Sequence, residues 1–267
     1  MCPSGAHYPI AWRRFRKKDA CEAGTFKDHT ELCIELIDDA IGRNIPGDFT
    51  FDSYFTNAKI LNHIQGHKRG YVGDLKLNRN VVFEGCQVQL NELAREIRFE
   101  DKKAVRFGQR RYWYFSKQMR IPHVDHPVRI VLFWKERGDR HASKALVSNR
   151  LTWEVIRMVL VYRHRWTGTE TYHRDGKQHL GLGDSQVRSG EGQTRHMSLV
   201  SAASSLLVRS VHQGRPHDWA RQTLRTIGEA CRAVKSELLD RLVDWIVDTL
   251  SNDPGAVPRI KTVLIRP

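Results

Sequence analysis

The sequence predicts an α/β protein that has a β-rich insertion in its middle and a helical C-terminal part. Strand-like and helix-like patterns alternate over residues 1–78, strand-like segments dominate residues 79–150, and helical periodicity prevails from residue 151 onward. The 267 residues are 40% hydrophobic and 28% charged, which is the composition of a globular chain. We therefore expect four regions, at residues 1–78, 79–150, 151–210 and 211–267.

The first strand and the first helix are expected before residue 48. Residues 7–15, HYPIAWRRF, are apolar and aromatic, which predicts a strand with a basic end. Asp28 and Glu31 have the spacing of a capping box and begin a helix. Apolar residues recur on one helical face as far as position 41, and the Asn-Ile-Pro-Gly run at 44–47 ends the helix.

Two more strands and a second helix complete the first region. Residues 48–52 are rich in aromatic and β-branched side chains and end on the carboxylate of Asp52. Thr56 is placed to cap a helix that Gly66 closes, and residues 71–76 form the next strand. Because strands and helices alternate, we expect a largely parallel sheet here.

Residues 79–150 have little helical periodicity. They contain five strand candidates, at Val81–Phe83, Ala104–Phe107, Arg111–Phe115, Val128–Trp134 and Lys144–Ser148. From residue 151 the chain is helical, with segments expected at Trp153–Tyr162, Thr169–Gln178, Met197–Val208 and Asp218–Leu250. We expect the last of these to pack in the core, with part of its apolar face free to pair with a second subunit. The residues from Asp253 are expected to form a loose tail.

The positive charge is concentrated in one part of the chain. The net charge is +14, and residues 102–150 alone contain 13 basic and 3 acidic residues, a net of +10. A plain solvated surface usually mixes both signs, so this block favours a polyanionic partner such as nucleic acid. Arg106, Arg110 and Arg111 of this block are the expected phosphate contacts.

Two acids are the strongest candidates for chemistry. Asp52 follows a strand, and α/β sheets place their sites at such strand ends, although an acid there is more often a simple cap or turn former. Glu170 precedes Lys177 by seven residues, which puts both side chains on one face of a helix. On such a face the carboxylate of Glu170 could bind a metal ion and the amine of Lys177 could bind a phosphate. The simpler interpretation is a solvent-exposed helix face whose charged residues pair with one another.

The stretch YRHRWTGTETYHRDGKQHLGLGDSQVR, with GQTRHMSLVSAASSLL after it and FDSYF upstream, resembles bacterial insertion-sequence transposases of the DDE class, in the insertion-sequence-4-like superfamily and its relatives. The resemblance extends from HYPIAWRRFRKK through TLRTIGEACRAV. Tyr162, Arg165, Glu170 and Lys177 match the signature Tyr-x2-Arg-x3-Glu-x6-Lys in type and order. One spacing departs from it: four residues, not three, separate Arg165 from Glu170.

The resemblance implies a ribonuclease-H-like core, with residues 1–78 as its first part, 79–150 as a basic insertion, 151–210 as its helical completion and 211–267 as a C-terminal amphipathic helix and tail. It also implies DNA transposition by two-metal chemistry, with Asp52 and Glu170 holding Mg²⁺ or Mn²⁺. Lys177 and Arg165 would clamp phosphate, and Tyr162 would orient a phosphate or base near the cut.

Families of this kind place a further Asp on an earlier strand, upstream of residues 7–15. Asp19, in an expected loop, is a poor substitute for it. We therefore expect an N-terminally truncated transposase whose two acids bind metal weakly and which is inactive as given. The alternatives are a non-catalytic remnant that binds DNA or oligomerises, and a ribonuclease-H-like nuclease unrelated to transposition.

The expected partners are double-stranded DNA, as transposon ends and target, and a second copy of the chain on that DNA. No apolar run approaches the length of a membrane span, and the five cysteines are widely spaced without a Cys-x2-Cys pair. We expect a reduced, cytoplasmic, nucleoid-associated bacterial protein without a structural zinc site. The His-Val-Asp-His run at 123–126 is a metal candidate, but a loop beside a strand is the simpler interpretation.

Overall fold

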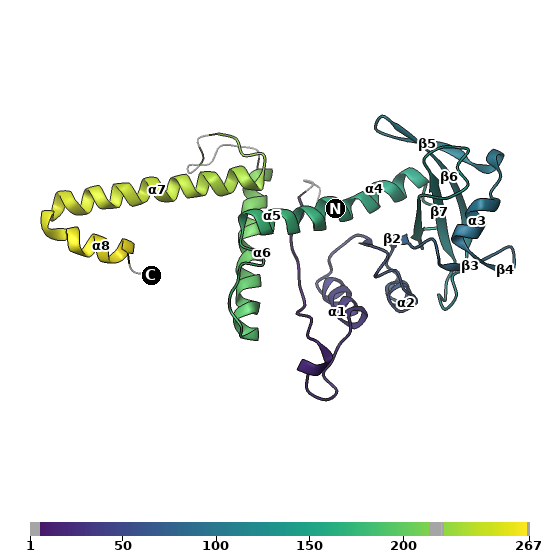
Figure 1. Cartoon of the computed structure of the whole chain (residues 1–267), viewed down its shortest axis with the longest axis horizontal. Coiled ribbons are helices and arrows are strands. Elements are labelled where there is room, and N and C mark those ends of the chain that lie inside the picture. Colours follow the sequence, from purple (N-terminus) through teal and green to yellow (C-terminus); the bar gives the residue numbers. More distant parts are fainter. Residues whose placement is uncertain (1–5, 214–219, 221, 266–267) are drawn as a thin grey trace. The chain divides into compact units, whose positions relative to one another are not determined.

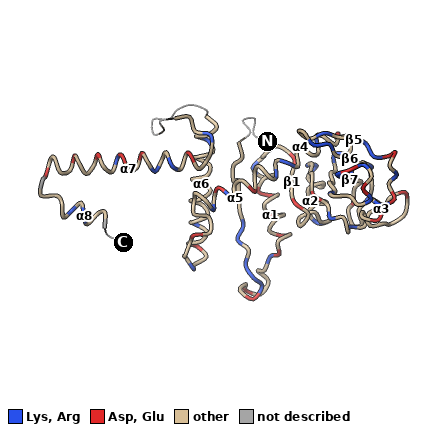
Figure 2. The backbone as a smooth tube through the Cα atoms, turned by 45° about the horizontal axis from the view of Figure 1, so that its top comes forward, with Lys and Arg blue, Asp and Glu red and all other residues tan. Residues whose placement is uncertain are grey.

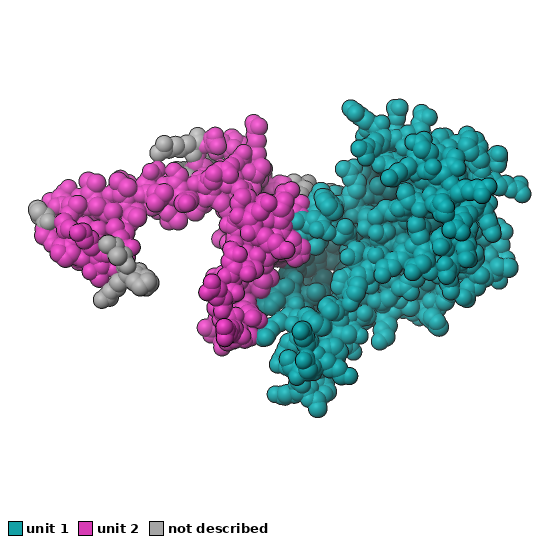
Figure 3. Space-filling model, in the orientation of Figure 1, with its two compact units in different colours: residues 1, 10–170 teal, residues 2–9, 171–267 magenta. Residues whose placement is uncertain are grey.

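The computed structural model describes residues 6–213, 220 and 222–265 (Figure 1). It divides the chain into two compact units (Figure 3). Among the described residues, unit 1 is Ile10–Glu170, and unit 2 combines residues 6–9 with those from Thr171 onward. The four described cysteines, at positions 21, 33, 86 and 231, are free. None of the described helices is both long and apolar enough to span a membrane.

Unit 1 is built on a six-stranded sheet with the order β1-β2-β8-β7-β6-β5. The strands are β1 (Phe49–Phe51), β2 (Tyr71–Leu75), β5 (Lys103–Phe107), β6 (Arg110–Met119), β7 (Val128–Trp134) and β8 (Lys144–Ser148). Only β1 and β2 are parallel, and every other neighbouring pair is antiparallel. A separate hairpin joins β3 (Asn80–Phe83) to β4 (Cys86–Gln89).

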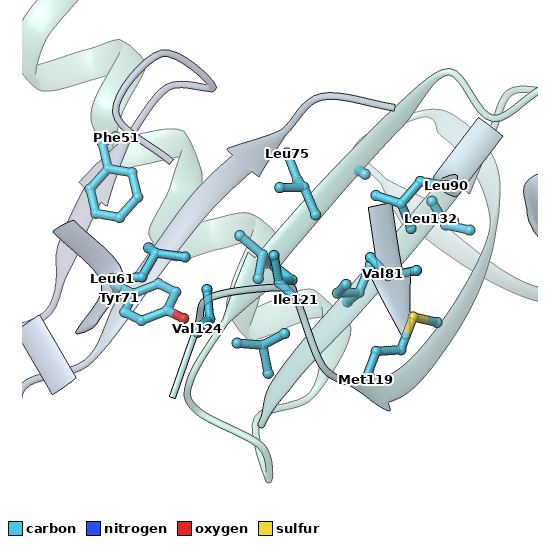
Figure 4. Packing of buried hydrophobic residues seen from close by; sticks show 14 of the residues in the cluster. Phe51, Leu61, Tyr71, Leu75, Val81, Leu90, Met119, Ile121, Val124 and Leu132 are labelled. Carbon is cyan, nitrogen blue, oxygen red and sulfur yellow. The ribbon is translucent and has the colours of Figure 1, made fainter. Parts of the chain in front are cut away.

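Helices pack on both faces of this sheet. One face carries α1 (His29–Gly42), α2 (Ala58–Gly66) and α3 (Leu90–Glu96), whose apolar residues share a core with side chains of β2, β7 and β8 (Figure 4). The other face carries α4 (Val155–Arg165), where Val155 and Met158 pack on Val72, Val131 and Leu146. Because β7 is covered on both faces, six of its seven residues are buried, as a continuous apolar run predicts.

Unit 2 is helical. It contains α5 (Thr171–His179), α6 (Gly190–His212), α7 (Ile227–Asn252) and α8 (Val257–Ile265), with the short turn η4 (Pro254–Ala256) before the last helix. Its small core gathers Ala220, Leu224 and Ala230, with Leu207 and Val211 of α6 against them. A capping box of Thr226 and Glu229 begins α7.

Several sequence expectations about these elements are wrong. Residues 7–15 form no strand, so the first region has one parallel strand pair instead of a largely parallel sheet. Residues 254–265 are helical instead of a loose tail. The helix expected at Asp218–Leu250 begins at Ile227, and residues 214–219 and 221 lie outside the described residues. Only the beginning of this helix packs in a core, through Ala230, whereas Leu238, Val243 and Val247 are each more than half exposed.

Candidate active site and nucleic-acid interface

Asp52 lies directly after β1, where the chain turns toward α2. Its Oδ1 accepts hydrogen bonds from the backbone amides of Tyr54 (3.0 Å) and Phe55 (3.4 Å), and its carbonyl oxygen accepts one from the Thr56 hydroxyl (2.9 Å). The carboxylate therefore has the turn-forming role common at strand ends. This role uses only Oδ1, and Oδ2 has no hydrogen-bond partner among the described residues, so it is free for a ligand.

Asp52 lines an open pocket of about 470 Å³ within unit 1. Helix α1 contributes mainly apolar residues to its lining, and strand β1 contributes all three of its residues. The helical segment after β8 contributes Arg165 and Thr169. The pocket therefore brings a carboxylate and a guanidinium from distant parts of the sequence to one largely apolar hollow.

Cys33 of α1 shares this pocket with Asp52. Burial of the thiol, with a smaller contribution from the negative charge of Asp52, raises the pKa of Cys33 to about 11. The thiol is thus protonated at neutral pH, which makes it a poor nucleophile.

Glu170 is bound to Arg165. The Nη1 atom of Arg165 donates to Oε1 of Glu170 at 3.0 Å, and the Arg165 side chain is only 19% exposed against 43% for that of Glu170. Burial acts to lower the pKa of Arg165, but the bond to Glu170 and the contact with Tyr162 raise it overall, so the guanidinium stays charged. Arg165 therefore lines the pocket of Asp52 and holds Glu170.

The extra residue between Arg165 and Glu170 is accommodated by a π-helical turn. Residues Trp166–Glu170 form this turn, η3, directly after α4. A π-helix advances through one more residue per turn than an α-helix and is frequent at functional sites. Because the added residue is absorbed in the wider turn, Arg165 still reaches Glu170 in spite of the departure from the signature spacing.

Tyr162 lies one turn before Arg165 on α4. Its ring lies 4.7 Å from Nζ of Lys144 and 5.7 Å from the guanidinium carbon of Arg165, and its hydroxyl makes a long contact of 3.5 Å to Oδ2 of Asp74. Asp74 also accepts from Lys144 at 3.1 Å. Tyr162 is therefore held between two cations, and Asp74 and Lys144 of the sheet fix its position.

Asp74 is a residue of this neighbourhood that sequence reasoning missed. It is a charged residue inside the otherwise apolar strand β2, next to β1. That interruption is the signal by which the sequence could have revealed it, because an acid in a buried strand needs a partner. Asp74 has two such partners, Lys144 and Tyr162.

The remaining sequence candidates lie elsewhere. Lys177 is exposed on α5 in unit 2, and Asp19 is exposed in the short turn η1 (Lys18–Ala20) and does not line the pocket. In the His-Val-Asp-His run, His126 is buried and its Nε2 lies 3.0 Å from the hydroxyl of Tyr71, whereas His123 is exposed. This run is not among the groups of three potential metal ligands in the described chain.

The first part of the basic block, residues 103–119, forms the hairpin of β5 and β6. Arg106 and Arg111 are paired directly across the two strands, and Arg110 follows the turn at Gly108, whose φ of 61° suits glycine. All three arginines are exposed, and no ion pair involves them in the part of the chain that the structure describes. Like charges directly opposite each other destabilise a strand pair, so an anion between them would stabilise this hairpin.

A groove of about 430 Å³ runs beside this hairpin. Arg110, Arg111 and Lys135 line it together with the aromatic residues Tyr112 and Trp113, and Glu136 is its one acid. Figure 2 shows basic positions along the β5 and β6 part of the sheet. Cations interleaved with aromatic rings provide contacts for both phosphates and bases.

The two carboxylates suit a hard divalent cation. Oδ2 of Asp52 is free of hydrogen bonds, Glu170 has one oxygen engaged by Arg165, and oxygen donors of this type are the ligands that Mg²⁺ and Mn²⁺ prefer. Each of the two carboxylates therefore has the donor type that such an ion prefers.

The fold and site define a class: a mixed α/β protein with carboxylates near one pocket and a cationic hairpin, suited to chemistry on nucleic-acid phosphates. The chain belongs to the transposase DDE domain family, because the model of that family matches residues 27–206. This match includes the whole six-stranded sheet, Asp52, Glu170 and Lys177, and it agrees with the ribonuclease-H-like fold expected from the sequence. No curated protein matches the chain.

The family supports transposition-type cleavage of DNA as the general activity, with DNA as the substrate and a divalent metal as the typical cofactor.

Proposed function

We propose that this chain supplies catalytic-core residues of an insertion-sequence-4-like transposase that cleaves and joins DNA strands at Asp52 and Glu170. The observation that carries the proposal is the position of Arg165. This side chain lines the pocket of Asp52 and also donates a hydrogen bond to Glu170. We expect the two carboxyl groups to share one metal site.

In this proposal Asp52 and Glu170 hold Mg²⁺ or Mn²⁺. When bound, such ions activate a water or a DNA 3′-hydroxyl and stabilise the oxygen that leaves phosphorus. Arg165 positions the carboxylate of Glu170 and neutralises part of the phosphate charge that enters the pocket. Tyr162, fixed by Lys144 and Asp74, orients a phosphate or a base beside the site, and Lys177 contacts a neighbouring phosphate.

The cationic hairpin provides the proposed surface for the DNA backbone. Arg106, Arg110 and Arg111 carry charge that the described protein does not neutralise, and the adjoining groove offers Tyr112 and Trp113 for contacts with bases. Contacts of this kind position the duplex without reading its sequence. We further propose that the DNA ligands are transposon ends and target DNA, and that the protein associates with the bacterial nucleoid.

We also propose that two copies of the chain act on one DNA. The exposed apolar side chains of α7 support this pairing.

The second candidate is a DNA-binding protein that does not cleave. Within the described residues, the only three potential ligands whose donor atoms lie within 4.8 Å of one another are Asp38, His63 and His67. Neither Asp52 nor Glu170 belongs to that group, and a site for two divalent ions needs more negative charge than two separate acids provide. This observation favours DNA binding without cleavage for the chain as given.

The test of the site is a Mn²⁺ titration followed by electron paramagnetic resonance. We expect one weakly bound ion, and Asp52→Asn and Glu170→Gln should each weaken its binding about tenfold or more, because each removes a charged ligand. Asp19→Asn is the matched control, since it removes an exposed carboxylate outside the pocket. Equal Mn²⁺ binding by all three variants would contradict the assignment of Asp52 and Glu170.

A further inference from the structure

A second cluster of ligand-type side chains lies in unit 1. Asp38 projects from α1, His63 from α2, and His67 is the residue that caps the C-terminal end of α2. Oδ1 of Asp38 lies 2.6 Å from Nε2 of His63 and 3.6 Å from Nε2 of His67, and one ligand atom of each of the three residues lies within 4.8 Å of the others. Two imidazoles and a carboxylate therefore converge on one point.

The fold explains why these three residues meet. His63 and His67 are four residues apart, which places them on one face of α2, and their ring centroids are 4.8 Å apart. Helices α1 and α2 pack through Ile37 and Ile64 in the same core. Because Asp38 directly follows Ile37, its side chain leaves the edge of that interface next to the two rings.

The dimensions match a tetrahedral metal site. Metal–ligand bonds of about 2.0–2.1 Å place neighbouring ligand atoms roughly 3.4 Å apart. The two distances from Oδ1 of Asp38, 2.6 Å to His63 and 3.6 Å to His67, lie on either side of that value. Displacements of the side-chain atoms by less than about 1 Å would therefore lengthen the first distance and shorten the second to the value that a metal requires. The side chains are 49%, 26% and 42% exposed for Asp38, His63 and His67, which leaves access for an ion and room for water as a fourth ligand.

We propose that Asp38, His63 and His67 form a binding site for a transition-metal ion of the Zn²⁺ class, separate from the carboxylates Asp52 and Glu170. Imidazole ligands select Zn²⁺, Co²⁺ or Ni²⁺ over Mg²⁺, whereas the carboxylate pair has the opposite preference. The ion would join α1 to α2. It would thereby stabilise the helix that supplies Leu32, Cys33 and Leu36 to the pocket wall.

The simpler explanation of the cluster is an ion pair between a protonated imidazole and Asp38, without any metal. The two explanations differ in what excess Zn²⁺ does. An ion pair gains nothing from the metal, whereas a site that binds the ion only when folded is stabilised as the free metal concentration rises above its dissociation constant.

The experiment measures Zn²⁺ binding to the full chain by competition with a chromophoric chelator, together with the unfolding temperature with and without the metal. We expect one ion per chain with micromolar affinity and a higher unfolding temperature in Zn²⁺. The double variant His63→Ala/His67→Ala should weaken binding by about a hundredfold or more and abolish the shift, because it removes two of three ligands. His141→Ala/His212→Ala is the matched control, since it removes two exposed imidazoles from elsewhere.

Co²⁺ provides an independent readout, because its visible absorption reports the coordination geometry. We expect tetrahedral bands for the wild type, for the control variant and for Asp52→Asn, and their loss in His67→Ala, a single change at the half-exposed end of α2 that keeps the fold. The proposal is overturned if the two double variants bind Zn²⁺ equally, or if His67→Ala leaves the Co²⁺ spectrum unchanged. Loss of the bands in Asp52→Asn would also overturn it, because the two sites would then not be separate.

Discussion

At the residue scale, two side chains, those of Thr56 and Asn57, fix the turn between Asp52 and α2. Thr56 was the predicted cap of α2, but the side chain of Asn57 is the cap and accepts from the amide of Ile60 at 3.2 Å. The hydroxyl of Thr56, which is 2% exposed, donates to the carbonyl oxygen of Asp52. Both residue types can cap a helix, and only the packing of the turn against the sheet decides which of them does so.

Gly73 of β2 keeps open the space that this turn occupies. A Cβ atom at position 73 would lie 2.7 Å from the ring of Phe51 and 2.7 Å from the hydroxyl of Thr56. We expect Gly73→Ala to lower the free energy of unfolding by about 1–3 kcal/mol, because it overpacks this site. Chemical denaturation measures this change. Gly66→Ala is the control, since a Cβ there meets nothing within 4 Å, and its effect should be neutral or slightly stabilising.

Cys33 reports on the charge of Asp52. Burial and that charge together hold the pKa of the thiol at about 11, so removing the charge in Asp52→Asn should lower this pKa and leave the contribution of burial. The thiolate fraction at a fixed pH of about 8 then rises, and alkylation of Cys33 should become severalfold faster. Mass spectrometry of the labelled peptides measures this rate, with the exposed Cys86 of the same sample as the reference. An unchanged ratio of the two rates would show that Asp52 carries no charge felt in the pocket.

At the element scale, the strands of the sheet centre were the easiest to predict. The strand bounds predicted from the sequence for β7 and β8 coincide with the observed strands. A strand that is covered on both faces has a continuous apolar run, and this pattern is easy to recognise. The interior of β6 was found, but the strand is ten residues long and extends beyond the predicted segment at both ends. The π-helical turn η3 was visible only as a spacing anomaly between Arg165 and Glu170.

The hairpin of β5 and β6 should dominate the salt dependence of DNA binding. Replacing Arg106, Arg110 and Arg111 by Gln should reduce the slope of log affinity against log salt by about 2.7, because each lost phosphate contact on duplex DNA contributes about 0.9. Fluorescence anisotropy at several salt concentrations measures this slope. Arg209→Gln/Arg241→Gln/Arg259→Gln removes the same charge from the helices of unit 2 and serves as the control. If the first variant keeps the wild-type slope, the DNA surface lies elsewhere, and the Arg163–Arg174 region is the next candidate.

At the scale of the whole molecule, the chain divides between Glu170 and Thr171. Both proposed catalytic acids, the pocket and the cationic hairpin belong to unit 1, whereas Lys177 belongs to unit 2. In unit 2, much of the apolar surface of α7 is exposed, with Leu238 at 62% and Trp245 at 39%. The division of the chain into four regions, at residues 1–78, 79–150, 151–210 and 211–267, stays a prediction.

The activity of the whole chain separates the two proposed functions. We expect the purified chain to bind DNA but neither to cleave nor to join transposon ends in Mg²⁺ or Mn²⁺, because no described group of three potential metal ligands contains Asp52 or Glu170 and a two-metal site needs a bridging acid. A protein extended upstream by a strand that bears an Asp should show strand transfer, and Glu170→Gln in that longer protein should abolish it. Gel assays with labelled DNA ends measure both outcomes.

Robust cleavage by the 267-residue chain, lost on mutation of Asp52, would contradict this expectation. It would mean that another acid of this sequence completes the site, and Asp19→Asn would test the first alternative. Cleavage that survives both Asp52→Asn and Glu170→Gln would instead contradict the assignment of the catalytic acids.

The sequence by itself determined the family, the α/β class, the strands of the sheet centre, the basic block and the candidate acids, because these depend on local pattern, composition and motif. The tertiary structure alone decided which distant residues meet. It joined Arg165 to Glu170 across a π-helical turn, placed Arg165 at the pocket of Asp52, and brought Asp38 beside His63 and His67. It also showed that residues 7–15 are not a strand. Strand pairing and ligand convergence depend on the packing of one element against another, and no local periodicity encodes that contact.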